Sequence, residues 1–145
     1  AKSKLRRRRV LRMSRLVVLL TRDDADSVYH ALSLASGALA MGWEAHVFMT
    51  SSAALLLTKE VSGRAKLSMK GVARYYVERR MKKLGIKDVD KFLLDVMKAG
   101  AKFYADEAVL RLAGYTPNDL MEGVSVSGTV SFLNLAKEAD VVITI

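Results

Sequence analysis

The sequence predicts an α/β protein, a three-layer α/β/α sandwich on a mainly parallel five-stranded sheet with an inserted basic helical segment. Three observations predict this fold. Short apolar runs of strand length alternate along the chain with segments of helical spacing. Glycines stand where several of those helices should end. The chain has 145 residues, the size of one domain, and 51% of them are hydrophobic, which is enough to form a buried core.

The first fifty residues predict a strand, a helix and a second strand. Residues 15–20, RLVVLL, are a continuous apolar run typical of a strand buried on both faces. Asp24 or Asp26 can cap the helix that follows, and Gly42 is placed to end it. Residues 43–50, WEAHVFMT, then predict the second strand. We expect the two strands to be parallel neighbours joined by a right-handed crossover.

The same alternation returns in the last third of the chain. The expected elements are a strand at 102–105, a helix at 107–113 stopped by Gly114, a strand at 123–127, a helix at 129–139 and a last buried strand at 140–145. Together with the first unit, they give five strands interleaved with helices.

Residues 51–100 interrupt the alternation and are expected to form a helical insertion. A short helix is expected at 53–59, a long basic amphipathic helix at 65–84 and a third helix at 88–99. In the last of these, Val89, Phe92, Leu93 and Val96 should face inward.

The net charge of +9 is concentrated in two segments. Residues 1–15 hold eight Lys and Arg and no acid, and residues 59–83 hold nine against two acids. The rest of the chain therefore carries a net charge of −6. We interpret residues 1–14 as a basic arm and residues 15–145 as one domain. Local basic segments on an acidic body favour a solvated or subunit-facing role over nucleic-acid binding, which stays an alternative.

Several classes of chemistry are excluded by the composition. The absence of cysteine removes disulfides, thiolate metal sites and thiol nucleophiles. His30 and His46 are the only histidines, and each is expected to be a structural or surface residue. We find no dinucleotide, phosphate-loop or zinc-protease motif, so no cofactor or metal is expected. No apolar run approaches the length of a membrane span, and we expect a cytoplasmic protein.

Ligands of parallel sheets bind beyond the carboxyl ends of the strands, and this rule nominates polar residues after four strands. They are Thr21, Asp23 and Asp24 after the first strand, Thr50 and Ser51 after the second, Asp106 and Glu107 after the third, and Ser127, Gly128 and Thr129 after the fourth. Residues 127–129 open a helix, whose backbone N–H groups suit an anion, although a cap by Ser127 or Thr129 is the preferred interpretation.

Two stretches resemble one protein family. The C-terminal KAGAKFYADEAVLRLAGYTPNDLMEGVSVSGTVSFLNLAKEADVVITI is similar to the closing signature of the DsrE/DsrF-like superfamily, in the branch labelled peroxiredoxin-like or oxidoreductase. The opening LVVLLTRDDADSVYHALSLASGALAMGWEAHVFMT is similar to the start of the same family. The stretches together cover roughly 85 residues of the chain.

The resemblance implies a compact α/β subunit that assembles as a trimer or a dimer of trimers. It also implies transfer of persulfide sulfur from a cysteine after the third strand to small sulfur-carrier proteins. This chain departs from that pattern, because Asp106 follows Tyr104 and Ala105 where the family places the cysteine. A carboxylate cannot hold a persulfide.

We therefore expect a non-catalytic binding or assembly subunit of the sulfur-relay type, with a sulfur-carrier or relay protein as partner. Two alternatives are left open at this stage. One is an enzyme in which Asp106 acts as a general base or ligand anchor. The other is a nucleic-acid-associated protein that uses the two basic segments.

Overall fold

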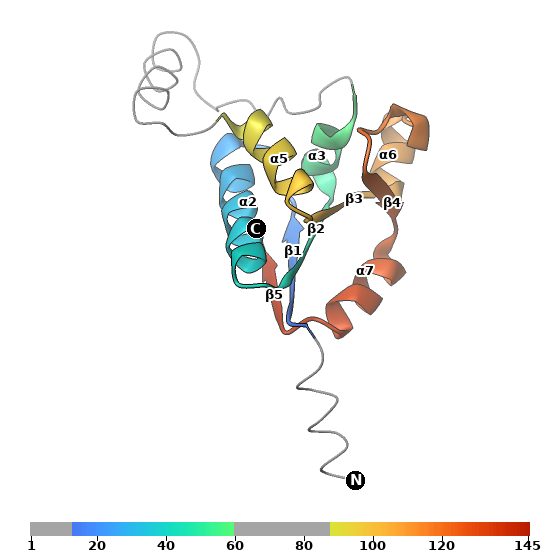
Figure 1. The fold of residues 1–145 in the computed structure, drawn as a ribbon. Coiled ribbons are helices and arrows are strands. Elements are labelled where there is room, and N and C mark those ends of the chain that lie inside the picture. The colour runs from blue at the N-terminus through green and yellow to red at the C-terminus, as the bar shows by residue number, and fades with distance from the viewer. Residues whose placement is uncertain (1–12, 60–87) are drawn as a thin grey trace.

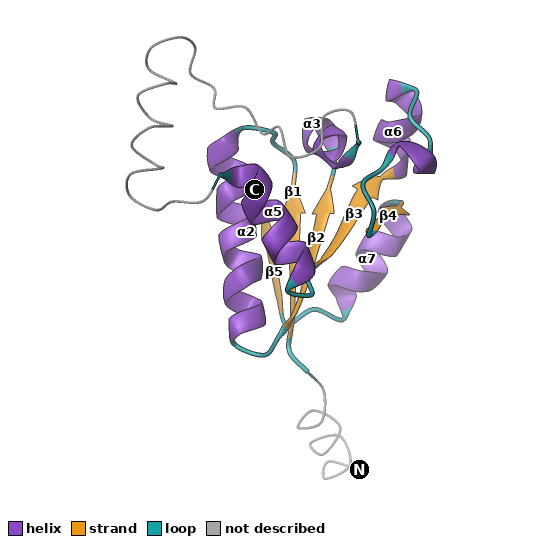
Figure 2. Ribbon diagram, turned by 45° about the horizontal axis from the view of Figure 1, so that its top comes forward, coloured by secondary structure: helices purple, strands orange, loops and turns teal. Residues whose placement is uncertain are grey.

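The computed structural model describes residues 13–59 and 88–145. Five strands form one sheet in the order β4-β3-β2-β1-β5, and every neighbouring pair is parallel (Figures 1 and 2). The strands are β1 (Arg15–Leu20), β2 (Glu44–Met49), β3 (Lys102–Asp106), β4 (Val124–Ser127) and β5 (Val141–Thr144). The predicted fold class and the parallel pairing of the first two strands are confirmed.

The helices follow the predicted order. They are α2 (Ala25–Ala40), α3 (Ser51–Ala54), α5 (Val89–Lys98), α6 (Glu107–Ala113) and α7 (Thr129–Lys137), with short 3₁₀ helices η1 (Leu55–Leu57) and η2 (Pro117–Asp119). The short helix expected at 53–59 begins earlier, at Ser51, and tightens into η1 before Thr58. The long basic helix expected at 65–84 lies outside the described residues, as does most of the basic arm.

One face of the sheet carries the main hydrophobic core. Alternate strand residues on this face pack against buried residues of α2, α5 and α6. Small residues such as Ala31 and Ala35 let α2 approach the strands closely, and both are fully buried. Val89, Leu93 and Val96 of α5 are buried as predicted, and Phe92 packs against the core while partly exposed. The core therefore lies between the sheet and these helices, of which α2 and α5 are at the left of Figure 1.

The opposite face of the sheet is covered differently. Its residues include Val17 and Phe48, which are buried but lie outside the main core. The ring of Phe48 contacts the ring of Phe132 in α7, with 5.0 Å between centroids. None of the residues of α7 is buried, so this helix covers the face only loosely. Among the described helices, α7 is the one that returns across the sheet, from β4 to β5.

The last strand differs from its prediction. The apolar run at 140–145 was expected to be a buried strand, but β5 is a mostly exposed edge strand. Val141 and Val142 have 36% and 48% of their surface exposed. Among the described residues β5 pairs with β1 alone, so it lies at an edge of the sheet although its composition is as apolar as that of a central strand.

Candidate functional site

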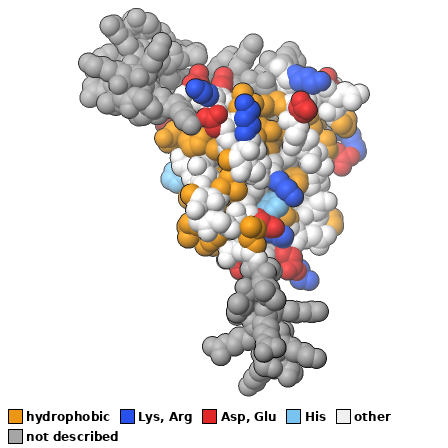
Figure 3. Space-filling view, viewed as in Figure 1, with side chains coloured by type: hydrophobic (Ala, Val, Ile, Leu, Met, Phe, Trp, Pro, Cys, Tyr) orange, Lys and Arg blue, Asp and Glu red, His pale blue; other side chains and the backbone are white. Residues whose placement is uncertain are grey.

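The sheet topology selects one part of the carboxyl edge. From β1 to β4 each connection moves in the same direction across the sheet, whereas the connection through α7 runs back to β5. Because such crossovers are right-handed, α6 and α7 leave the adjacent strands β3 and β4 toward opposite faces. Ligands of open parallel sheets bind at this kind of switch point. On the face drawn in Figure 3, acidic and basic side chains lie along the upper rim, where the strands end.

Asp106 stands at this switch point as the last residue of β3 and the cap of α6. Its Oδ1 accepts a 3.0 Å hydrogen bond from the backbone N–H of Ala108. Its Oδ2 accepts a 2.7 Å hydrogen bond from the hydroxyl of Thr50, which follows β2. Asp106 is half-buried, and each carboxylate oxygen is held by one donor of the protein. Thr50 and Asp106, nominated separately from the sequence, therefore meet at this edge.

Glu107 and the start of α7 form the other half of the switch point. Ser127 is the register partner of Asp106 across β3 and β4. A Cβ added to Gly128 would lie 4.0 Å from Oε2 of Glu107, so this carboxylate lies beside the glycine. The other oxygen, Oε1 of Glu107, forms an ion pair with Arg111 one turn further along α6, with 2.6 Å between Oε1 and the guanidinium nitrogen.

The cap expected from Ser127 or Thr129 is wrong. Gly128 occupies the N-cap position of α7, and no side chain donates or accepts a capping hydrogen bond there. Thr129 is instead the first helical residue and is exposed. Gly128 can serve as a cap because glycine leaves the first N–H groups open to solvent at little cost compared with a standard cap.

The residues nominated after β1 have structural partners of their own. The backbone N–H and the hydroxyl of Thr21 both donate to the carbonyl of Ile145, at 2.8 and 3.0 Å. Asp24 caps α2 by accepting from the backbone and hydroxyl of Ser27 and pairs with Arg22. Burial acts to raise the pKa of Asp24, but these hydrogen bonds hold it below its ordinary value. Asp23 is exposed.

Ser51 has the one positive φ angle, +50°, among the non-glycine residues that the structure describes. It follows Thr50 directly and begins α3, so the backbone turns sharply where β2 ends. The neighbouring Ser52 donates a long, 3.5 Å hydrogen bond to the carbonyl of Thr21. The left-handed conformation costs free energy for a residue with a Cβ.

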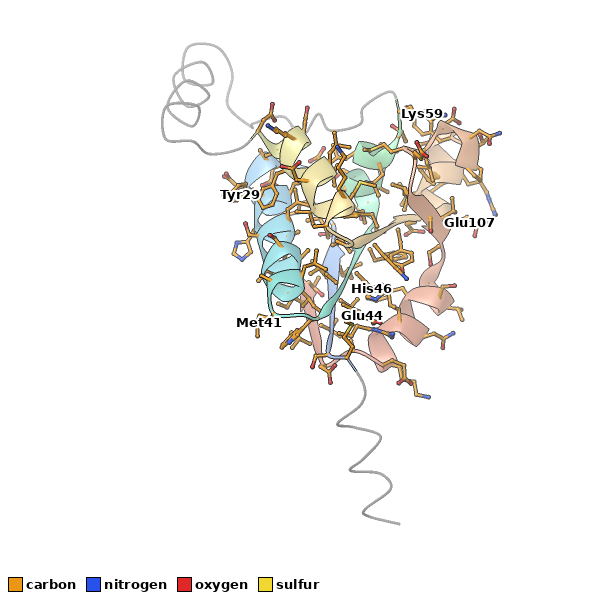
Figure 4. All side chains as sticks on the ribbon, viewed as in Figure 1. Tyr29, Met41, Glu44, His46, Lys59 and Glu107 are labelled. Carbon is orange, nitrogen blue, oxygen red and sulfur yellow. The ribbon has the colours of Figure 1, made fainter. Side chains whose placement is uncertain are left out.

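A polar network on the α7 side of the sheet was missed by the sequence analysis. Arg15 Nε lies 2.6 Å from Glu44 Oε2, and His46 Nε2 lies 3.4 Å from the same oxygen. His46 Nδ1 lies 2.9 Å from the hydroxyl of Tyr104. These side chains come from β1, β2 and β3 at one face, and Figure 4 shows His46 beside Glu44 and away from Glu107. The alternation of Glu44, His46 and Phe48 along β2 is the signal that could have predicted their common face.

The electrostatics of this network favour a neutral His46. The side chain is only 6% exposed, and burial lowers the pKa of His46, although the hydrogen bond with Glu44 opposes the change. The hydrogen bond from Arg15 lowers the pKa of Glu44, while burial raises the pKa of Tyr104. His46 is therefore a satisfied structural residue, as predicted, and His30 is exposed on α2.

Two further features of the described ranges 13–59 and 88–145 bear on other classes of function. Within them, no three His, Asp or Glu side chains are grouped so as to hold a metal ion. No helix in these ranges is both long enough and apolar enough to span a bilayer.

Comparison with known proteins settles the relationship that the two sequence stretches suggested. A family model described as DsrE/DsrF/DrsH-like matches residues 51–144, which is more than half of the chain. The chain belongs to the DsrE/DsrF/DrsH-like family. The resemblance stated from the sequence is thereby confirmed, and Asp106 lies within the matched region.

One curated relative and three solved structures are also similar to this chain. The sulfur carrier protein DsrE2 of Allochromatium vinosum is 23% identical over 155 residues, covering 90% of this chain and 98% of the relative. The ychN protein of E. coli matches with a TM-score of 0.64 at 14% identity, over 92% of this chain and 100% of that one. MTH1491 of Methanobacterium thermoautotrophicum has a TM-score of 0.64 at 18% identity, over 90% and 98%. BT1422 of Bacteroides thetaiotaomicron has 0.60 at 14%, over 91% and 95%. At these identities the three structures show a shared fold.

Proposed function

We propose that this member of the DsrE/DsrF/DrsH-like family is a non-catalytic binding or assembly subunit of the sulfur-relay type. It keeps the family fold, works as a homo-oligomer of three or six chains in the cytoplasm, and associates with a sulfur-carrier or relay protein. The name of the Allochromatium vinosum relative, a sulfur carrier protein, supports the link to sulfur transfer.

The observation that carries this proposal is the bonding of Asp106. The chain contains no cysteine, and the position where the resemblance places the persulfide holds a carboxylate. Its two oxygens accept from Thr50 and from the backbone of Ala108, so the side chain joins β2, β3 and α6. A side chain that links two strand ends and the start of a helix in this way suits a structural role. Each oxygen keeps one lone pair, and the enzymatic alternative would need such a lone pair to face a substrate.

The loosely covered face of the sheet supports assembly. Parallel sheets are normally buried on both faces, but α7 has no buried residue. Val130 and Leu133 of α7 are 73% and 58% exposed. Apolar side chains exposed on the outside of a helix that itself covers a sheet mark a surface suited to another subunit.

The proposal is tested with a small sulfur-carrier protein loaded with persulfide sulfur and followed by native mass spectrometry. We expect the carrier to form a complex with the oligomeric chain and to keep its sulfur during the incubation. Sulfur lost from the carrier in a reaction that needs this chain would overturn the non-catalytic role. Failure of loaded and unloaded carrier to bind would overturn the partner assignment.

A pair of variants separates binding from transfer. Asp106→Cys introduces a thiol at the family position, and Ser36→Cys introduces one in the middle of α2, where the side chain is exposed. Sulfur should move from the carrier to Asp106→Cys and not to Ser36→Cys, provided that the carrier docks over the carboxyl edge. Equal loading of the two variants would show that docking does not select this edge.

A further inference from the structure

The outer edge of β5 is short, four residues, but it carries no charged residue or proline to protect it from pairing. Its sequence, VVIT at Val141–Thr144, consists of uncharged, β-branched residues. Exposed edges of monomeric proteins commonly carry a lysine, a proline or a bulge, which prevent pairing with a second chain. β5 contains none of these residue types, and within the described residues only β1 pairs with it (Figure 2).

The hydrogen bonds to β1 identify the backbone groups that point outward. The N–H of Ile145 donates to the carbonyl of Leu19, and the carbonyl of Ile145 accepts from Thr21, both at 2.8 Å. Residues of a strand alternate in the side to which their backbone groups point. Ile143 therefore also faces β1, while the N–H and C=O groups of Val142 and Thr144 face away from it.

We propose that β5 pairs with β5 of a second copy of this chain, antiparallel about a two-fold axis at Ile143. In this register Val142 exchanges two hydrogen bonds with Thr144 of the partner subunit, and Thr144 exchanges two with Val142 of the partner subunit. All four outward groups of each strand are then satisfied, and the sheets join into one of ten strands. The proposal goes beyond the function proposed above, because it assigns a two-fold contact to a specific edge.

The charges beside β5 favour this arrangement. Asp140, at the start of the strand, accepts a 2.8 Å hydrogen bond from the backbone N–H of Arg15. Antiparallel pairing places the two copies of Asp140 at opposite ends of the joined strands, whereas parallel pairing would bring them together. Like charges directly opposite each other destabilise paired strands. Two copies of β5 can therefore pair without opposing their charges when they run antiparallel. This favours a second copy of the chain as the partner at this edge.

Disulfide trapping tests the register, since the native chain has no cysteine. Residues opposite each other in a non-hydrogen-bonded antiparallel pair have Cα atoms about 4.5 Å apart, within disulfide range. Ile143→Cys should therefore form covalent dimers rapidly under mild oxidation. Leu112→Cys is the matched control, because its side chain is 89% exposed on α6, away from β5, and reports random collision. Cross-linking of Ile143→Cys no faster than the control would overturn the proposal.

Light scattering on a second pair of variants tests the contact without a covalent bond. Val142→Lys adds a charge at the edge, and Leu112→Lys adds the same charge to the exposed side of α6. We expect Val142→Lys to halve the mass of the wild-type particle, with Leu112→Lys keeping the wild-type mass. If Val142→Lys keeps the wild-type mass, the edge contact is wrong. A mass of three chains in both wild type and Val142→Lys would overturn the edge contact while leaving the trimeric assembly standing.

Discussion

The hydroxyl of Thr50 donates a 2.7 Å hydrogen bond to Oδ2 of Asp106, and this bond joins the carboxyl ends of β2 and β3. The two residues are 56 positions apart in the sequence. Their contact places a carboxylate with a structural function at the position where the family resemblance places a reactive thiol. The consequence is that Asp106 can be tested both as a stabilising residue and as a position for sulfur chemistry.

The first prediction concerns the stability that Asp106 supplies. Asp106→Ala removes the cap of α6 and the acceptor of Thr50, and should lower the free energy of unfolding by about 1–2 kcal/mol. Thr50→Val should cost about 1 kcal/mol, and the double variant less than the sum, because the two residues share one hydrogen bond. Urea unfolding measures all three. Asp106→Asn should be nearly neutral, since the asparagine oxygen can keep the cap while its amide N–H donates to the hydroxyl of Thr50 in a reversed bond. Strictly additive losses in the double variant would contradict the shared bond.

The second prediction concerns sulfur uptake from a small-molecule donor. The wild-type chain should keep its intact mass after incubation with polysulfide, because it has no thiol. Asp106→Cys should gain sulfur, since a thiol at a helix N-terminus has a lowered pKa and is more often a thiolate. Ser36→Cys, in the middle of α2, should gain it more slowly. Intact-mass spectrometry over time gives the rates, and a sulfur adduct on the wild type would refute the expectation.

The third prediction concerns the pH dependence of stability. Because the pKa of His46 is lowered in the folded protein, the unfolded chain takes up this proton first as the pH falls. The contribution of neutral His46 to the free energy of unfolding is therefore complete above about pH 6.5, the pKa of histidine in the unfolded chain. It is lost as the pH falls below that value. The lowered pKa of Glu44 adds a loss at lower pH, near and below its unfolded value of about 4.3.

Variants of His46 and Tyr104 distinguish the loss of stability caused by His46 from the loss caused by Glu44. Urea unfolding of His46→Gln should show a smaller decrease in stability than the wild type between about pH 7 and pH 5.5. Tyr104→Phe removes the hydroxyl beside His46 and should lower stability by about 1 kcal/mol while a pH-dependent decrease remains. An unchanged slope in His46→Gln would show that His46 does not cause the decrease.

The fourth prediction compares two glycines. Gly114 ends α6 with φ +82°, so Gly114→Ala should destabilise the protein by about 1 kcal/mol. Gly37 lies inside α2, and a Cβ there would meet no atom within 4 Å. Gly37→Ala should therefore stabilise the protein by about 0.5–1 kcal/mol. Thermal unfolding measures both changes, and a gain in stability for Gly114→Ala would contradict the assigned role of the glycine.

The sequence by itself determined the order and type of the described elements. Apolar runs, helical spacing and capping residues are local signals, so Asp24 and Gly114 were assigned to the ends at which they stand. The glycine at α7 shows the limit of this reasoning, because several adjacent polar residues could each have capped the helix. The family resemblance likewise came from local motifs, and its Asp106 could be recognised as a departure without coordinates.

The tertiary structure decided which of these residues meet. The order β4-β3-β2-β1-β5 brings Thr50 to Asp106 and makes β5 an edge, although its sequence is as apolar as that of a central strand. The same order brings Arg15, Glu44, His46 and Tyr104 onto one face. Strand order is set by packing among segments far apart in the chain. The hydrophobic periodicity of one segment does not specify which strands lie beside it in the sheet.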